Sequence, residues 1–145
     1  MRLAAATILA SISWSACSTA TPAPAADIEP GQNFSLRAGE SAQTRDKALR
    51  VGFVEVTADS RCPKGAQCVW AGDASVRVWL QRGNGPMQAL DLHTAANAAQ
   101  AVRVLDHELR LVRLDPYPVN GKAIAKADYV ATLTLQRGST TEPER

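Results

Sequence analysis

The sequence predicts an all-β protein: a single antiparallel β-sandwich, immunoglobulin-like in general architecture, with a small β-barrel as the alternative. Three observations lead to this prediction. Apolar residues alternate with polar ones at a period of two, turn-forming residues recur at intervals of roughly ten, and no segment carries the 3.6-residue apolar period of a long helix. We therefore expect about seven short strands.

The first expected strand starts at Phe34 and Leu36, and the second covers 49–56. In the second, Leu49, Val51 and Phe53 share one parity whereas Val54 and Val56 have the other. One extra residue in a strand shifts its parity, so we expect a β-bulge between Gly52 and Val54. The same shift separates Leu109 and Leu111 from Val112 and Leu114.

The 75–81 segment is the clearest strand, because Val76, Val78 and Leu80 alternate with polar residues and with Trp79. The Gly83–Pro86 turn follows, so Met87–His93 is expected to return antiparallel with Leu90 and Leu92 facing the core. Trp79 lies on the opposite face, where it is either covered by a neighbouring segment or exposed. The 94–101 and 115–122 segments read as loops, and Tyr129–Gln136 as the final strand.

The first sixteen residues have the pattern of a secretory signal peptide: one positive charge at Arg2, an apolar stretch and then small residues. Ser15-Ala16-Cys17 resembles a bacterial lipobox, in which the cysteine is lipidated and becomes the mature N-terminus. Trp14 departs from the aliphatic residue usual at that position. Cleavage at Ala23-Pro24-Ala25 or just after Ala26 is the alternative.

Four segments follow from composition: a signal peptide at 1–16, an Ala/Thr/Pro-rich tether at 17–31, a β-sandwich domain at 32–137 and a flexible polar tail at 138–145. The chain has 16 basic and 14 acidic residues, and loss of the leader removes Arg2. A balance so near neutrality argues against nucleic acid as a partner and against a membrane surface held by charge alone.

Cys62 and Cys68 lie in a loop that runs from Asp59 to Gly72. Because an exported chain meets an oxidising environment, this pair is expected to form a disulfide. Closing a seven-residue ring stabilises the fold by about 2.4 kcal/mol in the loop-entropy treatment.

The pattern DSRCP-x4-CVWAG in this loop resembles a family of small, functionally uncharacterised bacterial secreted or lipid-anchored proteins. The resemblance implies export and a β domain. It implies no catalytic residue, since that family has no established activity.

The loop has two interpretations. In the structural one, Arg61 pairs with Asp59, Trp70 covers one end of the core and Gly72 makes the turn. In the functional one, the bridge holds Arg61, Lys64 and Trp70 ready for a partner at a reduced ordering cost.

No residue set predicts catalysis, a cofactor or a metal site. His93 and His107 stand near Asp91, Asp106 and Glu108, but without metal-ligand spacing. Ser60, His107 and Asp91 could be written as a triad, yet no nucleophile elbow is present.

The sequence therefore favours a non-enzymatic binding module of the bacterial cell envelope, placed at the periplasmic face of a membrane as a lipoprotein, or else soluble in the periplasm or secreted. Its membrane contact would be the N-terminal lipid anchor, and its partner an envelope protein or a cell-wall ligand. A periplasmic hydrolase inhibitor acting through the disulfide loop is the first alternative, and an enzyme is the second.

We expect the mature chain to begin at an acylated Cys17, because the small residues before it fit a lipobox. Intact-mass spectrometry should then give residues 17–145 plus lipid, and the protein should fractionate with membranes. A water-soluble product that begins near Asp27 without added lipid mass contradicts this expectation.

Overall fold

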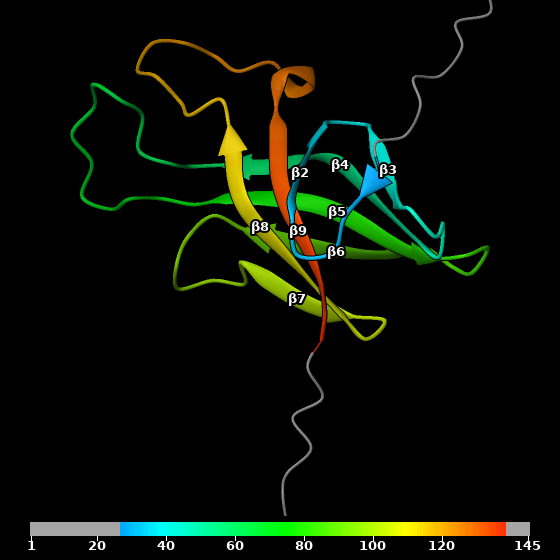
Figure 1. Ribbon diagram of the computed structural model, residues 1–145. Helices are drawn as coiled ribbons and strands as arrows, with labels where there is room; N and C mark the ends of the chain where they lie inside the picture. Colours follow the sequence, from blue (N-terminus) through cyan, green and yellow to red (C-terminus); the bar gives the residue numbers. More distant parts are fainter. Residues whose placement is uncertain (1–26, 139–145) are drawn as a thin grey trace, which may run out of the picture.

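The computed structural model describes residues 27–138 as two packed, mostly antiparallel sheets that do not close into a barrel (Figure 1). The sandwich prediction is thus confirmed. The strands are β1 (Asp27–Ile28), β2 (Asn33–Arg37), β3 (Ser41–Thr44), β4 (Leu49–Asp59), β5 (Ala74–Arg82), β6 (Gln88–His93), β7 (Ala101–Val104), β8 (His107–Asp115) and β9 (Val130–Arg137), with one 3-10 turn, η1 (Lys126–Asp128).

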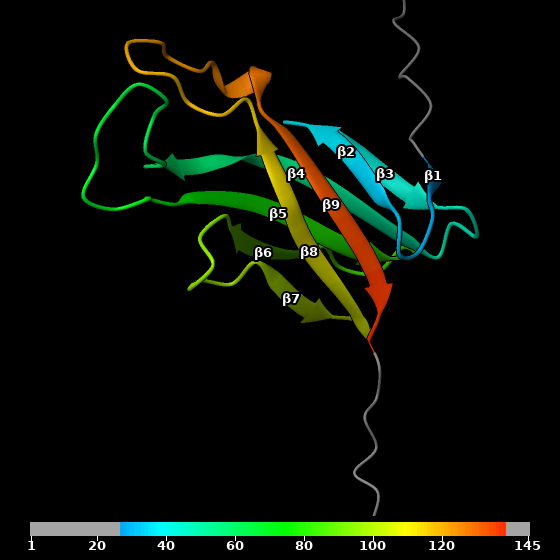
Figure 2. The ribbon, with the colours of Figure 1, turned by 60° about the vertical axis from the view of Figure 1, so that its left-hand side comes forward.

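One sheet has the order β1-β3-β4-β5-β6 and the other β2-β9-β8-β7. All pairings are antiparallel except that of β1 with β3. The two sheets cross face to face at a steep angle, as Figures 1 and 2 show. Each strand can therefore bury its alternate residues against the other sheet.

The core lies between the sheets and is made of these alternate residues. Phe53 is its largest fully buried side chain, and the β5 residues that the alternation selected are all completely buried. The fully buried large side chains are Phe53, Ile28, Leu80, Leu92, Leu109, Leu133, Leu135, Val51, Val76 and Val78. Leu90, expected in the core, is only half-buried at its edge.

Two bulges occur where the parity changes predicted them. The β4–β5 register shifts between Phe53 and Glu55, and the β8–β9 register shifts between Leu111 and Arg113. Val54 and Val112 are the extra residues, and both side chains are exposed. A bulge turns one residue outward and restores the buried face after it, so Val56 and Leu114 are again buried.

Trp79 is half-buried on the outer face of its sheet, opposite Gly52 of β4. A Cβ on Gly52 would overlap the indole ring, so the ring occupies the space that a side chain would fill. The Arg50 guanidinium lies 5.7 Å from the ring centroid. Strand neighbours therefore cover Trp79, and the absence of a side chain at Gly52 makes this possible.

The folded region extends further toward the N-terminus than the sequence predicts. The expected tether ran to residue 31, but Ile28 is completely buried and β1 pairs with β3. The expected signal peptide, Cys17, the rest of the tether and the tail beyond Gly138 lie outside the described residues. Between residues 27 and 138, no helix has the length and apolarity needed to cross a membrane.

Gly52→Ala should lower the free energy of unfolding by about 1–3 kcal/mol, because the new methyl group must displace the indole. Chemical denaturation of Gly52→Ala, Trp79→Ala and the double variant measures the coupling between the two residues. In the Trp79→Ala background the Gly52→Ala change should cost little. Equal cost in both backgrounds would show that the indole is not the obstacle.

Candidate functional site

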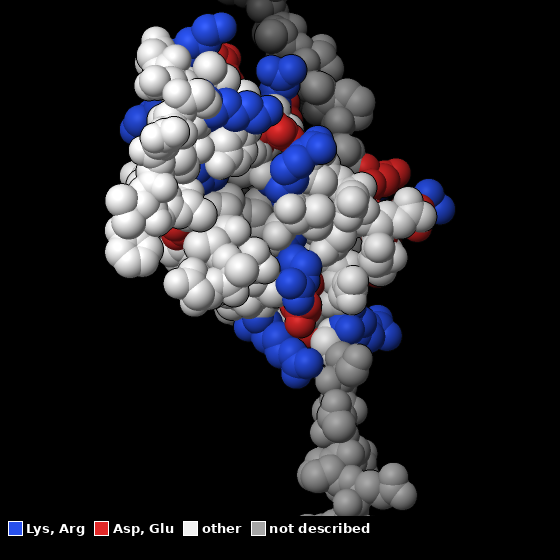
Figure 3. Space-filling view, turned by 90° about the vertical axis from the view of Figure 1, so that its left-hand side faces the viewer, with Lys and Arg blue, Asp and Glu red and all other residues white. Residues whose placement is uncertain are grey.

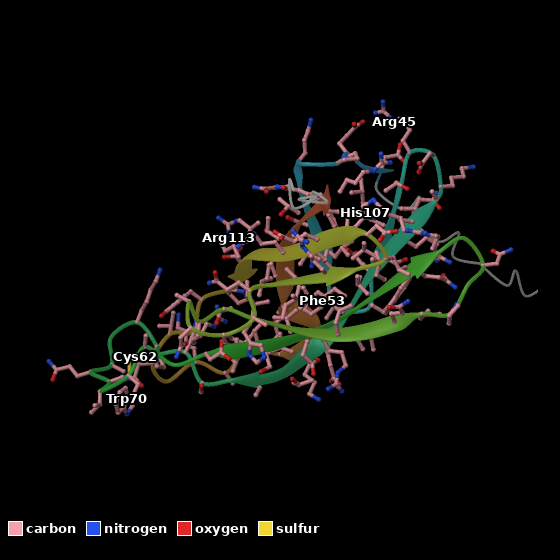
Figure 4. The ribbon with its side chains drawn as sticks, turned by 90° about the horizontal axis from the view of Figure 1, so that it is seen from below. Arg45, Phe53, Cys62, Trp70, His107 and Arg113 are labelled. Atoms are coloured by element: carbon pink, nitrogen blue, oxygen red, sulfur yellow. A yellow bond between two sulfur atoms is a disulfide. The ribbon has the colours of Figure 1, made fainter. Side chains whose placement is uncertain are left out.

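Three loops gather at one end of the sandwich, which we call the distal end: the disulfide loop (60–73), the 94–100 loop and the 116–125 loop. β1 lies at the other end, because Ile28 pairs with Thr44 and Thr44 bonds Leu49 at the start of β4. The disulfide loop follows Asp59 at the end of that eleven-residue strand, roughly 30 Å away. Figure 4 shows the same separation, with Cys62 and Trp70 at one end and Arg45 at the other.

The predicted disulfide is present. Cys62 and Cys68 are bonded, and their Cα atoms are 5.9 Å apart. Backbone bonds tie the ring to the 116–125 loop: Lys64 N–H donates to the Pro118 carbonyl at 2.9 Å, and Asn120 N–H donates to the Lys64 carbonyl at 3.0 Å. The disulfide loop is therefore fixed both by its own bridge and by its neighbour.

Arg61 is the centre of a buried network that joins the two sheets. Its Nε and Nη2 donate to the two carboxylate oxygens of Asp59 at 2.9 and 2.7 Å. Its Nη1 and Nη2 also donate to the carbonyls of Leu114 and Pro116 at 2.8 and 3.0 Å. Tyr129 O–H donates to Asp59 at 3.0 Å. One guanidinium thus binds the end of β4, the end of β8 and the start of the 116–125 loop.

The network sets the charge of its members. Burial disfavours the ionised carboxylate of Asp59, but the hydrogen bonds from Arg61 and Tyr129 outweigh it and hold the Asp59 pKa below its usual value. Burial works against the charged form of Arg61 too, and Asp59 overcomes it, so the Arg61 pKa is raised. Burial and the bond to Asp59 raise the pKa of Tyr129. At neutral pH the pair is therefore ionised.

The three predicted binding residues differ in how exposed their side chains are. The Arg61 side chain is only 6% exposed and does not reach outward to a partner, so that part of the prediction is corrected: its donors are used inside the fold. Lys64 is exposed, with its Nζ 5.7 Å from the Tyr117 ring centroid. Trp70 is 81% exposed and does not cover the core, and Val69 beside it is 89% exposed. Trp70 and Lys64 remain as surface residues of the loop.

Gly72 makes the turn that the sequence predicts at the end of the loop. Its φ is +74°, and a Cβ there would overlap the Ser60 carbonyl oxygen. Only glycine fits this position without a shift of backbone, since both the dihedral and the close approach exclude a side chain. This close approach lets the disulfide loop return beside its own start.

A groove of about 720 Å³ lies between the disulfide loop and the 94–100 loop. Trp70 and Tyr117 contribute its aromatic surfaces, and its other lining residues are Ser60, Arg61, Ala71, Gly72, Asp73, Thr94, Ala95, Ala96 and Asn97. Seen from the distal end, a broad area of the surface carries no charge (Figure 3). Sequence reasoning missed the groove because its walls come from loops far apart in the chain.

Asp73 fixes one wall of the groove. Its Oδ1 accepts from the backbone N–H groups of Thr94 and Ala95 at 3.0 and 2.9 Å, and its Oδ2 lies 2.6 Å from His93 Nδ1. Burial raises the Asp73 pKa, but the bonds with His93, Ala95 and Thr94 outweigh it and leave the pKa lowered. Asp73 therefore joins β5 to the 94–100 loop as a charged acceptor.

The polar groups are not arranged for triad catalysis. A triad needs the carboxylate on one imidazole nitrogen and the nucleophile on the other, whereas both Asp73 and Ser75 approach Nδ1 of His93, at 2.6 and 3.4 Å. His107 lies elsewhere, at a second cavity of about 620 Å³ beside β1. Asp91 pairs with Arg77.

Within residues 27–138, no three His, Cys, Asp or Glu side chains gather as a metal site would require.

Asp59→Asn should reduce the free energy of unfolding at pH 7 by about 3 kcal/mol, because it leaves the buried Arg61 guanidinium without its counter-charge. The pH dependence has a defined sign. A carboxylate whose pKa is lowered by folding stabilises above its unfolded pKa of about 4 and loses that contribution as the pH falls.

Urea titrations from pH 7 to pH 2 should therefore show a shallower acid loss in Asp59→Asn than in the wild type, with the remaining slope due to other carboxylates such as Asp73. Asp106→Asn, a change at an exposed carboxylate, is the matched control and should follow the wild type. If the stabilities of the wild type and of Asp59→Asn fell in parallel as the pH was lowered, the pairing with Arg61 would not lower the Asp59 pKa.

The network and the groove are thus built from local sequence and from long-range contacts together. No family model, curated protein or solved structure matches the chain, and the resemblance carried by DSRCP-x4-CVWAG stays a prediction.

Proposed function

We propose that this chain is an exported, lipid-anchored protein of the bacterial cell envelope that works as a non-enzymatic binding module through its distal end. The observation that carries the proposal is the 81% exposure of Trp70 on a loop fixed by a disulfide and by backbone bonds to the 116–125 loop. A large exposed aromatic on a rigid loop loses little entropy when a partner covers it, so it is suited to binding.

The direction of the distal end supports this role. β1, the first described strand, lies at the opposite end of the sandwich, so a chain anchored through Cys17 would present the disulfide loop away from its attachment (Figure 2). Lys64 and Lys122 are exposed in this region, and the one acidic residue of the three loops, Asp73, is bound by backbone N–H groups of the 94–100 loop. The two lysines would speed the encounter with a partner and orient it.

Binding is favoured over catalysis because Asp59 and Asp73, two carboxylates at this end, already accept hydrogen bonds within the fold. Asp59 is bound by Arg61 and Tyr129, and Asp73 by the 94–100 loop. A general base must be free to take a proton from a substrate. These carboxylates instead accept several hydrogen bonds each and stabilise the loops.

A second candidate is inhibition of a periplasmic hydrolase. Val69 and Trp70 are the most exposed large apolar residues of the described chain and are adjacent at the tip of the disulfide loop. Such a rigid apolar tip could enter the cleft of an enzyme. This candidate uses the same residues and differs only in the consequence of binding.

Trp70→Ala and Lys64→Ala test the proposal. We expect the wild-type protein to capture a defined component from an envelope fraction, and Trp70→Ala to weaken that interaction at least tenfold once the component is purified and titrated. Lys64→Ala should mainly slow association and reduce its dependence on salt. Enzyme assays with the purified component would then distinguish inhibition from simple binding.

Met87→Ala is the matched control for Trp70→Ala, because Met87 is 62% exposed and precedes β6 at the end near β1. Arg103→Ala, in the exposed position of β7, is the control for Lys64→Ala. Circular dichroism and urea midpoints must show that every variant is folded. Full affinity in folded Trp70→Ala would move the binding surface away from the disulfide loop.

A further inference from the structure

The charged residues that line the groove beside Trp70, Arg61 and Asp73, are already bound within the fold. The Arg61 guanidinium donates to Asp59 and to two carbonyls, and its side chain is almost completely buried. The Asp73 carboxylate accepts from the 94–100 backbone and contacts His93. A ligand in this groove therefore meets an ion pair and a carboxylate whose oxygens already accept hydrogen bonds from the protein, and it needs no charge of its own.

Small and aromatic residues make up much of the groove lining. Ala71, Gly72, Ala95 and Ala96 have small side chains and bring the backbone close to the open space, while Trp70 and Tyr117 supply two aromatic surfaces. Tyr117 is held by the Arg61 guanidinium, 5.2 Å from its ring centroid, and by Lys64 on the neighbouring loop. The aromatic surface is thus present before a ligand arrives.

Polar groups accompany these apolar surfaces. Asn97 is an exposed lining residue whose amide can both donate and accept hydrogen bonds, whereas the Ser60 hydroxyl already donates to the Asp73 carbonyl at 3.0 Å. The ligand class that combines apolar faces, many hydroxyl groups and no charge is a neutral sugar. An aromatic ring can cover the C–H face of such a sugar while amides and hydroxyls bind its edge.

We propose that this groove binds a neutral oligosaccharide, with Trp70 packed against one sugar ring and Asn97 bonded to its hydroxyl groups. The inference rests on the proposed function and names its ligand class. A volume of about 720 Å³ lies in the range of small-molecule sites and admits a short oligosaccharide. A flat lipid surface would leave this concavity unfilled.

The tryptophans allow a direct measurement. The chain has three tryptophans, Trp14, Trp70 and Trp79. The full chain with Trp14→Phe and Trp79→Phe therefore has Trp70 as its sole indole. Chitotriose, cellotriose and maltotriose are titrated against this variant, and the emission of Trp70 should shift and saturate with at least one of them. Isothermal titration of the wild-type chain with the same sugars provides a second measurement that does not depend on the Phe replacements.

Trp70→Ala should weaken sugar binding by at least tenfold and Asn97→Ala by severalfold, each followed by isothermal titration. Met87→Ala should match the wild type. Raising the salt concentration from 0.05 to roughly 0.5 M should leave the affinity unchanged, because screening acts on charge pairs between ligand and protein and a neutral ligand forms none.

Three outcomes would overturn the inference: no saturable response to any of the three sugars at millimolar concentration, unchanged binding in Trp70→Ala, or a clear preference for polygalacturonate or for anionic vesicles. The proposed function is tested separately. If Trp70→Ala loses an envelope protein partner while no sugar binds, the binding module stands and the groove ligand is not a neutral glycan.

Discussion

The ion pair between Asp59 and Arg61 is the interaction on which the distal end depends. Asp59 is the last residue of β4 in one sheet, and the Arg61 guanidinium also donates to the Leu114 carbonyl at the end of β8 in the other sheet. The loops that carry Trp70 and Tyr117 start from these two places. If the pair were lost, the sheets would still share their apolar core, but the loops above them would no longer be held at a fixed spacing.

A buried ion pair is costly unless its remaining hydrogen-bonding groups are satisfied, because both charges leave water. Here the guanidinium has two carbonyl acceptors besides Asp59, and the carboxylate has Tyr129 besides Arg61. The net gain in stability from such a pair is small compared with the loss when one partner is removed. Its main effect is therefore geometric: it permits one arrangement of the loops and penalises others.

The sequence was sufficient for those features that depend on neighbouring residues. Alternation predicted β5 and β9, changes of parity predicted the bulges at Val54 and Val112, and cysteine spacing together with the expectation of export predicted the disulfide. It was not sufficient for β1, β3 and β7, because they have two, four and four residues and too little alternation to read. Their strand character comes from the partners that they pair with.

The sequence likewise predicted some features of the candidate site and not others. The pairing of Arg61 with Asp59 could be anticipated from their separation of two residues, but the carbonyls of Leu114 and Pro116 that bury it could not. For the same reason the exposure of Trp70 was left open by the sequence. Loop residues lack a repeating pattern, and their environment is decided by segments distant in the chain.

The position of β1 has a mechanical consequence. Ile28 is buried at the start of the described chain, and only two residues of β1 pair with β3. A pull applied at Asp27 would act on this short parallel pairing before it reached the longer strands. Because the pairing is at the edge of its sheet, it can peel away while β4 and β5 stay joined. Tension would therefore extract Ile28 and open the core near β1 before it acted on the longer strands.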